Sequence, residues 1–198
     1  MTIRELEIII GIMIFLRIGI NLVKYAWSWK KPAKEYIDSI IISGLVALFL
    51  ISYIVGTFYV PSGSMKPTFV PIDYIIVNKL LYRITEPKRG DIVVFSPPHK
   101  KNSPDYIKRV IGLPNETLEV RDGQVLIDGK ELEEAYIPEE QKPAYDYGPV
   151  KIPGGCFFMM GDNRNNSEDS HVWGFLPRKN IEGKASLIFW PIWRAKLL

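Results

Sequence analysis

The first 60 residues contain two long apolar stretches separated by a polar, basic segment. No charged residue occurs between Ser39 and Val60, and an uncharged run of 22 residues is long enough to cross a bilayer as a helix. The pattern therefore predicts a transmembrane helix over residues 38–59. The alternative is a buried core helix, but a helix so long and apolar on all sides would need a large protein around it.

Residues 8–23 form a second apolar stretch, which Arg17 interrupts. A lone arginine near the middle of a span costs roughly 3 kcal/mol on the insertion scale, although it can snorkel or pair with another helix. A cleavable secretory signal peptide is the competing interpretation. It is disfavoured because Glu5 and Glu7 lie in the first residues and no small-x-small cleavage site follows. The sequence thus predicts one or two N-terminal transmembrane helices.

The segment between these stretches predicts the orientation in the membrane. Residues 24–37 contain four lysines, with Trp27 and Trp29 as interface anchors, and clustered lysines in a short loop mark the cytoplasmic side. We therefore expect residues 1–60 to be an anchor in the cytoplasmic membrane. Residues 61–198 are expected to form an extracytoplasmic domain.

After residue 60 the apolar residues fall into short β-branched or aromatic runs separated by Gly, Pro, Asn and Asp, a pattern typical of strands. The domain is therefore predicted to be mainly β. Turn dipeptides at Asp122-Gly123 and Asp128-Gly129 predict a hairpin and its continuation over residues 117–132. Two stretches rich in proline, 96–104 and 138–153, are expected to be irregular loops. The predicted strands cover residues 74–77, 92–95, 107–111, 117–120, 125–127, 157–160 and 186–190.

Charge and cysteine content exclude several classes of function. Residues 61–198 contain 19 basic and 18 acidic residues, so no basic block favours binding of nucleic acid. The single cysteine, Cys156, cannot form an internal disulfide. One cysteine and two distant histidines also make a zinc site improbable, so neither a metal nor another cofactor is expected.

The first segment with candidate chemistry is Pro61-Ser62-Gly63-Ser64-Met65-Lys66-Pro67-Thr68. A serine on a tight turn can expose its hydroxyl, but Ser-Gly-Ser is also common in linkers, so turn statistics alone favour a hinge next to the membrane. A serine nucleophile needs an adjacent base. Only His99 and His171 could complete a Ser-His-Asp triad. The other route is a lysine that burial keeps neutral.

Lys108 is the lysine best placed for that role. Strand alternation puts Lys108 on one face with Tyr106 and Val110, and Arg109 on the other, where it can pair with an acid. The alternative is a lysine on an edge strand that guards against aggregation. A third segment, Gly161 to Gly174, is dense in Asp, Asn and Ser. Such a density of hydrogen-bonding side chains is typical of a loop that orients other groups. A calcium-binding loop is the alternative, but the spacing of the oxygen ligands does not fit an EF-hand.

Taken together and in this order, these segments resemble bacterial type I signal peptidases, which are serine proteases with a Ser-Lys dyad. Residues 61–68 resemble the nucleophile motif of that family, 90–95 its core strand, 106–116 its lysine motif and 161–174 its C-terminal motif. The resemblance implies an antiparallel-sheet catalytic domain that removes signal peptides from exported preproteins after a small-x-small site. Alternatives are a specialised maturation peptidase for one substrate, or a catalytically silent scaffold.

The resemblance also assigns roles to individual residues. Ser64 would attack the scissile carbonyl and Lys108 would accept its proton, while Ser62 Oγ and the Ser64 N–H would form the oxyanion hole. Ser167 would hydrogen-bond the Lys108 amine. The groups that would support the site from behind are Arg109, Asp162 and Asp169. The residues that would line the small substrate pockets are Phe58, Val60, Met65, Tyr106 and Ile107.

Two positions depart from the family pattern. His171 stands where the family commonly has arginine, which would weaken a salt bridge to Asp169 or make it depend on pH. Asn115 stands where the family commonly has glycine, and asparagine tolerates a left-handed backbone better than most residues. Neither departure affects the proposed dyad.

Overall fold

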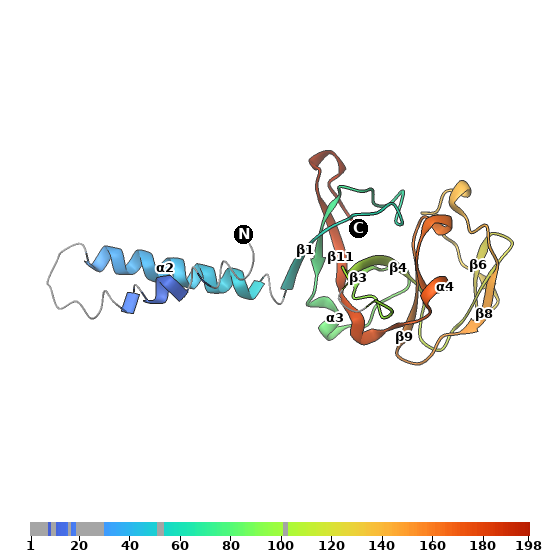
Figure 1. The fold of residues 1–198 in the computed structure, drawn as a ribbon, viewed down its shortest axis with the longest axis horizontal. Coiled ribbons are helices and arrows are strands. Elements are labelled where there is room, and N and C mark those ends of the chain that lie inside the picture. Colours follow the sequence, from blue (N-terminus) through green and yellow to red (C-terminus); the bar gives the residue numbers. More distant parts are fainter. Residues whose placement is uncertain (1–7, 9–10, 16, 19–29, 51–53, 101–102) are drawn as a thin grey trace. The chain divides into compact units, whose positions relative to one another are not determined.

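The computed structural model describes residue 8 and residues 11–15, 17–18, 30–50, 54–100 and 103–198 (Figure 1). Contacts between Cα atoms divide the chain into two compact units, Met1–Val55 and Gly56–Leu198. The second unit contains all the candidate site residues.

The first unit is helical where it is described. The described positions between 8 and 18 are helical, and α2 covers Lys30–Phe49. Arg17 donates hydrogen bonds to the Asp38 carboxylate, so the arginine that interrupts the first apolar stretch pairs with an acid on α2. No helix in the described ranges combines the length and the apolar character that a membrane span requires.

The two predicted spans have different outcomes. Much of 8–23, namely positions 9–10, 16 and 19–23, lies outside the described residues. In the stretch 38–59, α2 ends at Phe49, residues 51–53 lie outside the described residues, and Val55–Tyr59 form strand β1. The predicted C-terminal boundary of that helix is therefore wrong. The β-branched and aromatic residues 55–59 pair with a sheet instead, which absence of charge alone does not reveal.

The larger sheet of the second unit is ordered β1-β2-β11-β3-β4-β9-β10, with β12 pairing with β11. Its neighbouring strands from β2 onward pair antiparallel. The strands are β1 Val55–Tyr59, β2 Tyr74–Asn78, β3 Ile92–Phe95, β4 Tyr106–Gly112, β9 Cys156–Met160, β10 Leu176–Pro177, β11 Ile181–Trp190 and β12 Lys196–Leu197.

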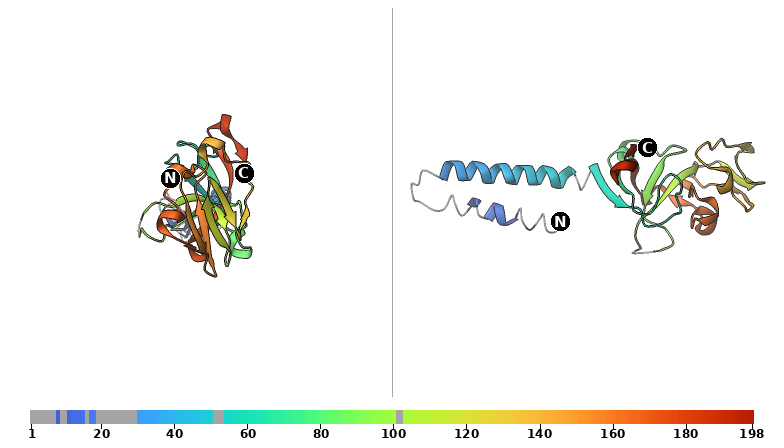
Figure 2. Two further views of the ribbon diagram at one scale, coloured as in Figure 1. Left: turned by 90° about the vertical axis from the view of Figure 1, so that its right-hand side faces the viewer. Right: turned by 90° about the horizontal axis from the view of Figure 1, so that it is seen from above.

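A smaller antiparallel sheet is ordered β7-β6-β5-β8 and is inserted in the chain between β4 and β9. In Figure 1, β6 and β8 lie on one side of β9 and α4, whereas β1 and β11 lie on the other. The right-hand view of Figure 2 also places the small sheet, in yellow, away from β1, in cyan. Its strands are β5 Thr117–Arg121, β6 Gln124–Ile127, β7 Lys130–Glu131 and β8 Tyr147–Lys151.

Both faces of the central strands are covered, because the apolar residues of β3 and β9 alternate between separate core clusters. Ile92 and Val94 pack in one cluster with Val60, whereas Val93 and Phe95 pack in another. On β9, residues 157 and 159 join that second cluster, and residues 158 and 160 join a third that lies against the small sheet. Strands β3 and β9 are therefore apolar throughout rather than alternating.

The prediction of a mainly β domain is confirmed, and each predicted strand overlaps an observed one. The predicted irregular loop 138–153 is wrong in part, because Tyr147–Lys151 form β8. The prolines in this stretch disfavour a strand in the sequence pattern. However, β8 lies at an edge of the smaller sheet, where a proline is tolerated. Short helices α3 Leu81–Ile84 and α4 Ser170–Trp173 carry no helical period long enough to detect.

Candidate active site

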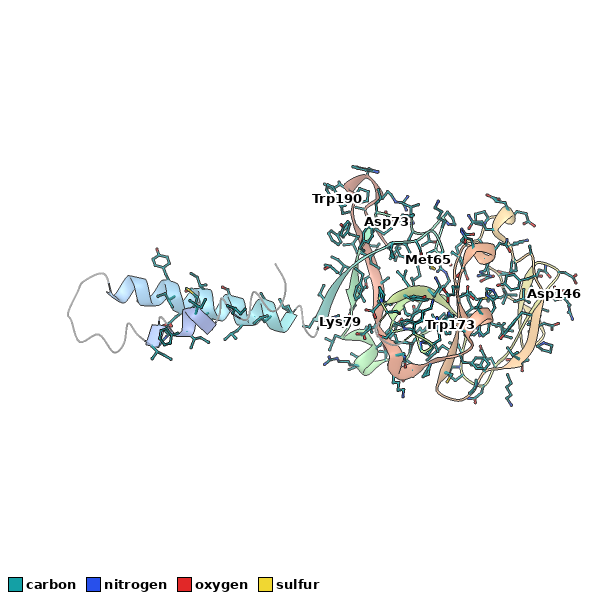
Figure 3. The ribbon with its side chains drawn as sticks, viewed as in Figure 1. Met65, Asp73, Lys79, Asp146, Trp173 and Trp190 are labelled. Atoms are coloured by element: carbon teal, nitrogen blue, oxygen red, sulfur yellow. The ribbon has the colours of Figure 1, made fainter. Side chains whose placement is uncertain are left out.

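The candidate nucleophile, Ser64, lies on a turn between β1 and β2. The turn is closed by hydrogen bonds from Lys66 N to Gly63 O (3.1 Å) and from Phe69 N to Met65 O (2.9 Å). Met65, which is labelled in Figure 3, is fully buried and packs with Val60 and Phe69. Met65, the residue after Ser64, thus anchors the turn by packing in the hydrophobic core.

The hydroxyl of Ser64 meets the amine of Lys108. Lys108 Nζ lies 2.6 Å from Ser64 Oγ, and Ser62 Oγ lies 3.3 Å from the same hydroxyl. Neither His99 nor His171 hydrogen-bonds Ser64 Oγ in the described part of the chain, so no Ser-His-Asp triad forms there. Residues 61–68 are thus more than a hinge in this structure, because they bring a serine hydroxyl into contact with a buried lysine amine.

Lys108 is buried on β4, with 4% of its surface exposed. In the sheet register it faces Val93 of β3, and its Nζ lies 5.7 Å from the centre of the Tyr106 ring. Burial lowers the pKa of the Lys108 ammonium from 10.5 to about 8, against the opposing effect of the Asp169, Asp162 and Glu168 carboxylates. A considerable fraction of this amine is therefore neutral near pH 8.

Arg109, the next residue on β4, forms a buried ion pair with Asp162. Its Nε and Nη2 donate to the two carboxylate oxygens at 2.8 and 2.6 Å, and Thr68 Oγ1 donates to the same carboxylate at 2.5 Å. Arg109 Nη1 also donates to Gly90 O at 3.0 Å. Because Thr68 lies at the end of the Ser64 turn, this cluster connects β4, the turn and the loop after β9.

The loop that follows β9 lies against the Ser64 turn. A Cβ built on Gly161 would lie 2.4 Å from Ser64 O, so only glycine allows this approach. Gly161 N donates to Asp169 at 2.9 Å, and Asp169 also caps α4 by accepting from His171 N. Asp169 is fully buried, which explains why its charge acts on Lys108 without a direct contact.

Ser167 does not make the hydrogen bond predicted for it. Its Oγ is buried and has no hydrogen-bond partner, and Lys108 Nζ donates to Ser64 Oγ instead. Ser167 lies beside Gly161, because a Cβ on Gly161 would lie 2.2 Å from Ser167 Oγ. The predicted bond between Ser167 and Lys108 is therefore absent from this arrangement.

A cavity of about 560 Å³ opens beside Ser64 and Lys108. Four of the five predicted pocket residues line it, namely Phe58, Val60, Tyr106 and Ile107. Met65 does not, because its side chain points from the turn into the core. The cavity is also lined by Lys100 and Glu168, which form an ion pair at 2.8 Å.

The two departures from the family pattern keep their local geometry. Asn115 has a φ of 72°, so asparagine occupies a left-handed turn as its chemistry predicts. His171 Nδ1 lies 2.7 Å from Asp169 Oδ1, and the imidazole stacks on Tyr145 with ring centres 4.5 Å apart. The contact to Asp169 thus persists, but it is an ion pair only when His171 is protonated.

Several residues close to the site were not predicted individually. Asn163 donates from its backbone N to Ser64 O and from Nδ2 to Gly63 O. Thr68 joins the Arg109–Asp162 pair, and Arg164 is held by Glu134 at 2.7 and 2.6 Å. The density of polar residues in 161–174 was the only signal for Asn163 and Arg164. Glu134 follows β7 of the small sheet, and no local sequence pattern indicates that this residue lies near the site.

The arrangement is suited to attack by a serine hydroxyl on a carbonyl carbon. A lysine of lowered pKa can serve as a general base for a hydroxyl that it contacts, and this pair lies at the wall of a largely apolar cavity. Among the described residues, no group of three or more His, Cys, Asp or Glu side chains is arranged to hold a metal ion.

The chain matches one family model and is similar to several known proteins. Residues 33–190 match the family described as "Signal peptidase, peptidase S26". The chain is 47% identical over 167 residues to "Signal peptidase I" of Leptolyngbya laminosa, covering 81% of each protein. It is 36% identical to "Signal peptidase I S" of Bacillus subtilis, covering 83% of this chain and 92% of that one. A solved signal peptidase I from Enterococcus faecalis is 33% identical, with a TM-score of 0.45, and covers 51% of this chain and 97% of that one.

Proposed function

We propose that this chain, which belongs to the signal peptidase family (peptidase S26) and is a serine endopeptidase, removes signal peptides from exported preproteins through a Ser64–Lys108 dyad. The observation that carries the proposed mechanism is the 2.6 Å contact between Lys108 Nζ and Ser64 Oγ in a buried setting that lowers the lysine pKa to about 8.

The reaction begins when neutral Lys108 accepts the proton of Ser64 Oγ as that oxygen attacks the scissile carbonyl carbon. The carbonyl oxygen becomes an anion, which Ser62 Oγ and the Ser64 N–H stabilise. Losing one such donor typically costs about 2.7–4 kcal/mol of transition-state stabilisation. Lys108 then donates its proton to the departing amine, and water hydrolyses the acyl-enzyme with Lys108 again as the base.

The carboxylates behind the dyad balance the charge that forms on Lys108. Asp169 and Asp162 are fully buried, and both favour the protonated lysine. Asp162 is neutralised by Arg109, so its influence on Lys108 is partly cancelled. This balance keeps the lysine neutral often enough to act as a base and still stabilises the ammonium in the transition state.

The substrate occupies the cavity as an extended segment. β1 is at the end of the sheet order, so a strand can add along residues 58–62 by β-augmentation. Phe58, Val60, Tyr106 and Ile107 form apolar walls beside Ser64. Apolar walls favour apolar residues before the cut, and the family resemblance implies that these residues are small, as at a small-x-small site.

The enzyme acts at the outer surface of the cytoplasmic membrane, anchored by its N-terminal unit. The uncharged run 39–60, the lysine-rich loop 24–37 and exposed apolar side chains on α2 support the anchor. Such side chains include Ile40, Ile42, Leu45 and Val46. A preprotein held in the same membrane by its signal peptide would present its cleavage site close to that surface.

Cleavage of a purified preprotein in detergent tests this proposal. Ser64→Ala and Lys108→Ala are each expected to abolish cleavage while the thermal unfolding transition remains cooperative. The matched controls are Ser186→Ala and Lys130→Ala, whose side chains lie outside the cavity lining. Substantial turnover by either site variant, with wild-type enzyme active, would refute the dyad. Release of mature domains from a panel of preproteins would also separate a general peptidase from one that matures a single substrate.

A further inference from the structure

Asn163 holds the peptide groups on both sides of Ser64. Its side-chain Nδ2 donates to Gly63 O at 3.1 Å, and its backbone N donates to Ser64 O at 3.0 Å. These two carbonyls belong to the peptide planes that precede and follow Ser64. Since the orientations of the two planes define the φ and ψ angles of the residue between them, one neighbour fixes the backbone of the nucleophile.

The side-chain bond has a specific consequence for the Ser64 N–H. A peptide group is planar and trans, so its N–H points opposite to its C=O. The Gly63 carbonyl is fixed by Asn163 Nδ2 and by Lys66 N, both at 3.1 Å. The direction of the Ser64 N–H is therefore fixed as well. Within the described residues this N–H donates to no protein acceptor, so it is available to a group bound in the cavity.

Asn163 is itself rigidly held. Its neighbour on one side, Asp162, pairs with Arg109 at 2.6 Å, and its neighbour on the other, Arg164, pairs with Glu134 and donates to Gly161 O at 3.0 Å. Arg164 and Asp162 are almost entirely buried. The chain is thus anchored on both sides of Asn163 by buried ion pairs.

We propose that Asn163 is a positioning residue for the oxyanion hole: by anchoring Gly63 O, its amide aims the Ser64 N–H at the developing anion. This inference rests on the proposed function, because it assigns a device to the same reaction. Asn163 does not touch the reacting atoms, and it acts only through the Gly63–Ser64 peptide.

The test compares three variants in the same short loop. Asn163→Ala removes the amide but keeps the backbone N–H, and Asn163→Asp replaces the donor with an acceptor that repels Gly63 O. The control is Asn165→Ala, because Asn165 bonds Ala144 N and Lys142 O, at 2.7 and 2.8 Å, and not the turn. All three are assayed for kcat, KM and inhibition by a substrate-like peptide aldehyde. Ser64 Oγ adds to the aldehyde carbon, its proton passes to Lys108, and the aldehyde oxygen becomes the anion.

Misaiming one donor should cost less than deleting it, so we expect kcat of Asn163→Ala to fall roughly 10- to 100-fold, with KM within about threefold of wild type. Asn163→Asp should lose more. The inhibition constant of the aldehyde should rise by a factor similar to the loss in kcat, and the midpoint of the pH profile should stay where it is in wild type. Asn165→Ala should keep wild-type kinetics.

The ratio of KM to the aldehyde inhibition constant does not depend on how much enzyme is folded, so poor folding of a variant cannot mimic the result. An unchanged ratio in both Asn163 variants would overturn the positioning role, as would an equal change in Asn165→Ala. A shifted pH midpoint would show instead that Asn163 acts through Lys108. If wild-type enzyme shows no cleavage that depends on Ser64, the proposed function itself fails, which is a separate outcome.

Discussion

The two faces of β4 hold neighbouring basic residues whose pKa values are shifted in opposite directions. Lys108 and Arg109 are both buried, with 4% and 8% of their surfaces exposed. Lys108 donates to a neutral hydroxyl, and burial lowers its pKa to about 8. Arg109 donates twice to the Asp162 carboxylate, which raises its pKa although burial opposes that.

Burial disfavours both cations, so the difference lies in what each one touches. Arginine cannot be deprotonated in a protein, so a buried arginine requires a carboxylate in direct contact. Lysine can lose its proton, so it tolerates a site where carboxylates act only from a distance. The strand thus separates a buried ion pair on one face from a buried amine of lowered pKa, the proposed general base, on the other.

The largest expected effect is the loss of activity when Lys108 is replaced by arginine, a cation that cannot be deprotonated. Lys108→Arg keeps a positive charge but provides no base, so kcat/KM for a preprotein should fall by at least about 10²- to 10⁴-fold. Lys130→Arg, at an exposed position on β7, serves as the control and should remain active. Near-normal turnover by Lys108→Arg would remove the chemical distinction between the two faces.

On the structural face, breaking the ion pair should cost stability. Asp162→Asn leaves the Arg109 charge buried without a carboxylate, so the free energy of unfolding should fall by about 3–5 kcal/mol. Urea denaturation measures this change. Glu119→Gln is the comparison, because its partner Arg121 is 57% exposed and the pair should contribute less than about 1 kcal/mol. Equal effects of the two substitutions would contradict the assignment.

Replacing the buried Lys108 amine should raise the free energy of unfolding, whereas Asp162→Asn should lower it. The folded pKa of Lys108, about 8, lies below its ordinary value of 10.5, so folding favours the neutral form. Protonation therefore destabilises the wild type fully below pH 8, and its stability recovers as pH rises from about 8 to 10.5. Lys108→Met should be more stable than wild type at pH 7, by up to about 3 kcal/mol.

The pH dependence makes this prediction specific. The advantage of Lys108→Met should shrink by roughly 1 kcal/mol between pH 7 and pH 9, because wild-type Lys108 loses its proton in that window. Urea denaturation of both proteins at several pH values provides the measurement. An advantage that does not vary with pH, or a variant less stable than wild type, would argue against a destabilised ammonium.

The smallest expected effect concerns Glu168, at the rim of the cavity. Its carboxylate raises the pKa of Lys108, so Glu168→Gln should move the midpoint of the kcat/KM profile below its wild-type value. The side chain of Glu168 is 48% exposed, so the shift should decrease as salt is added. Glu86→Gln, at an exposed site paired with Arg178, should leave the midpoint unchanged. A shift to higher pH would have the wrong sign.

The sequence predicts the strands well where their apolar character is local. Ile92–Phe95 matches β3 at both ends, and the turn dipeptide at 122–123 lies between β5 and β6. Prediction fails where tertiary pairing decides the structure, as at 55–59 and in β8. Strand alternation was sufficient to separate Lys108 from Arg109, because the period of a strand is two residues.

The site is only partly encoded in such local patterns. Which serine meets Lys108 depends on contacts across more than 40 positions of the sequence, and family resemblance rather than periodicity paired it with Ser64. The same resemblance predicted a bond to Ser167 that this arrangement does not contain. The anchoring of Gly63 by Asn163 spans 100 positions, so no local signal could reveal it.

The ionisation of Lys108 can be followed directly by NMR of enzyme labelled with ¹³C at the lysine Cε, with Lys108→Met identifying the resonance. A titration with its midpoint near pH 8 is expected, because burial without a carboxylate contact disfavours the ammonium. A midpoint at or above the ordinary lysine value of 10.5 would show that the amine stays charged at working pH and cannot be the base.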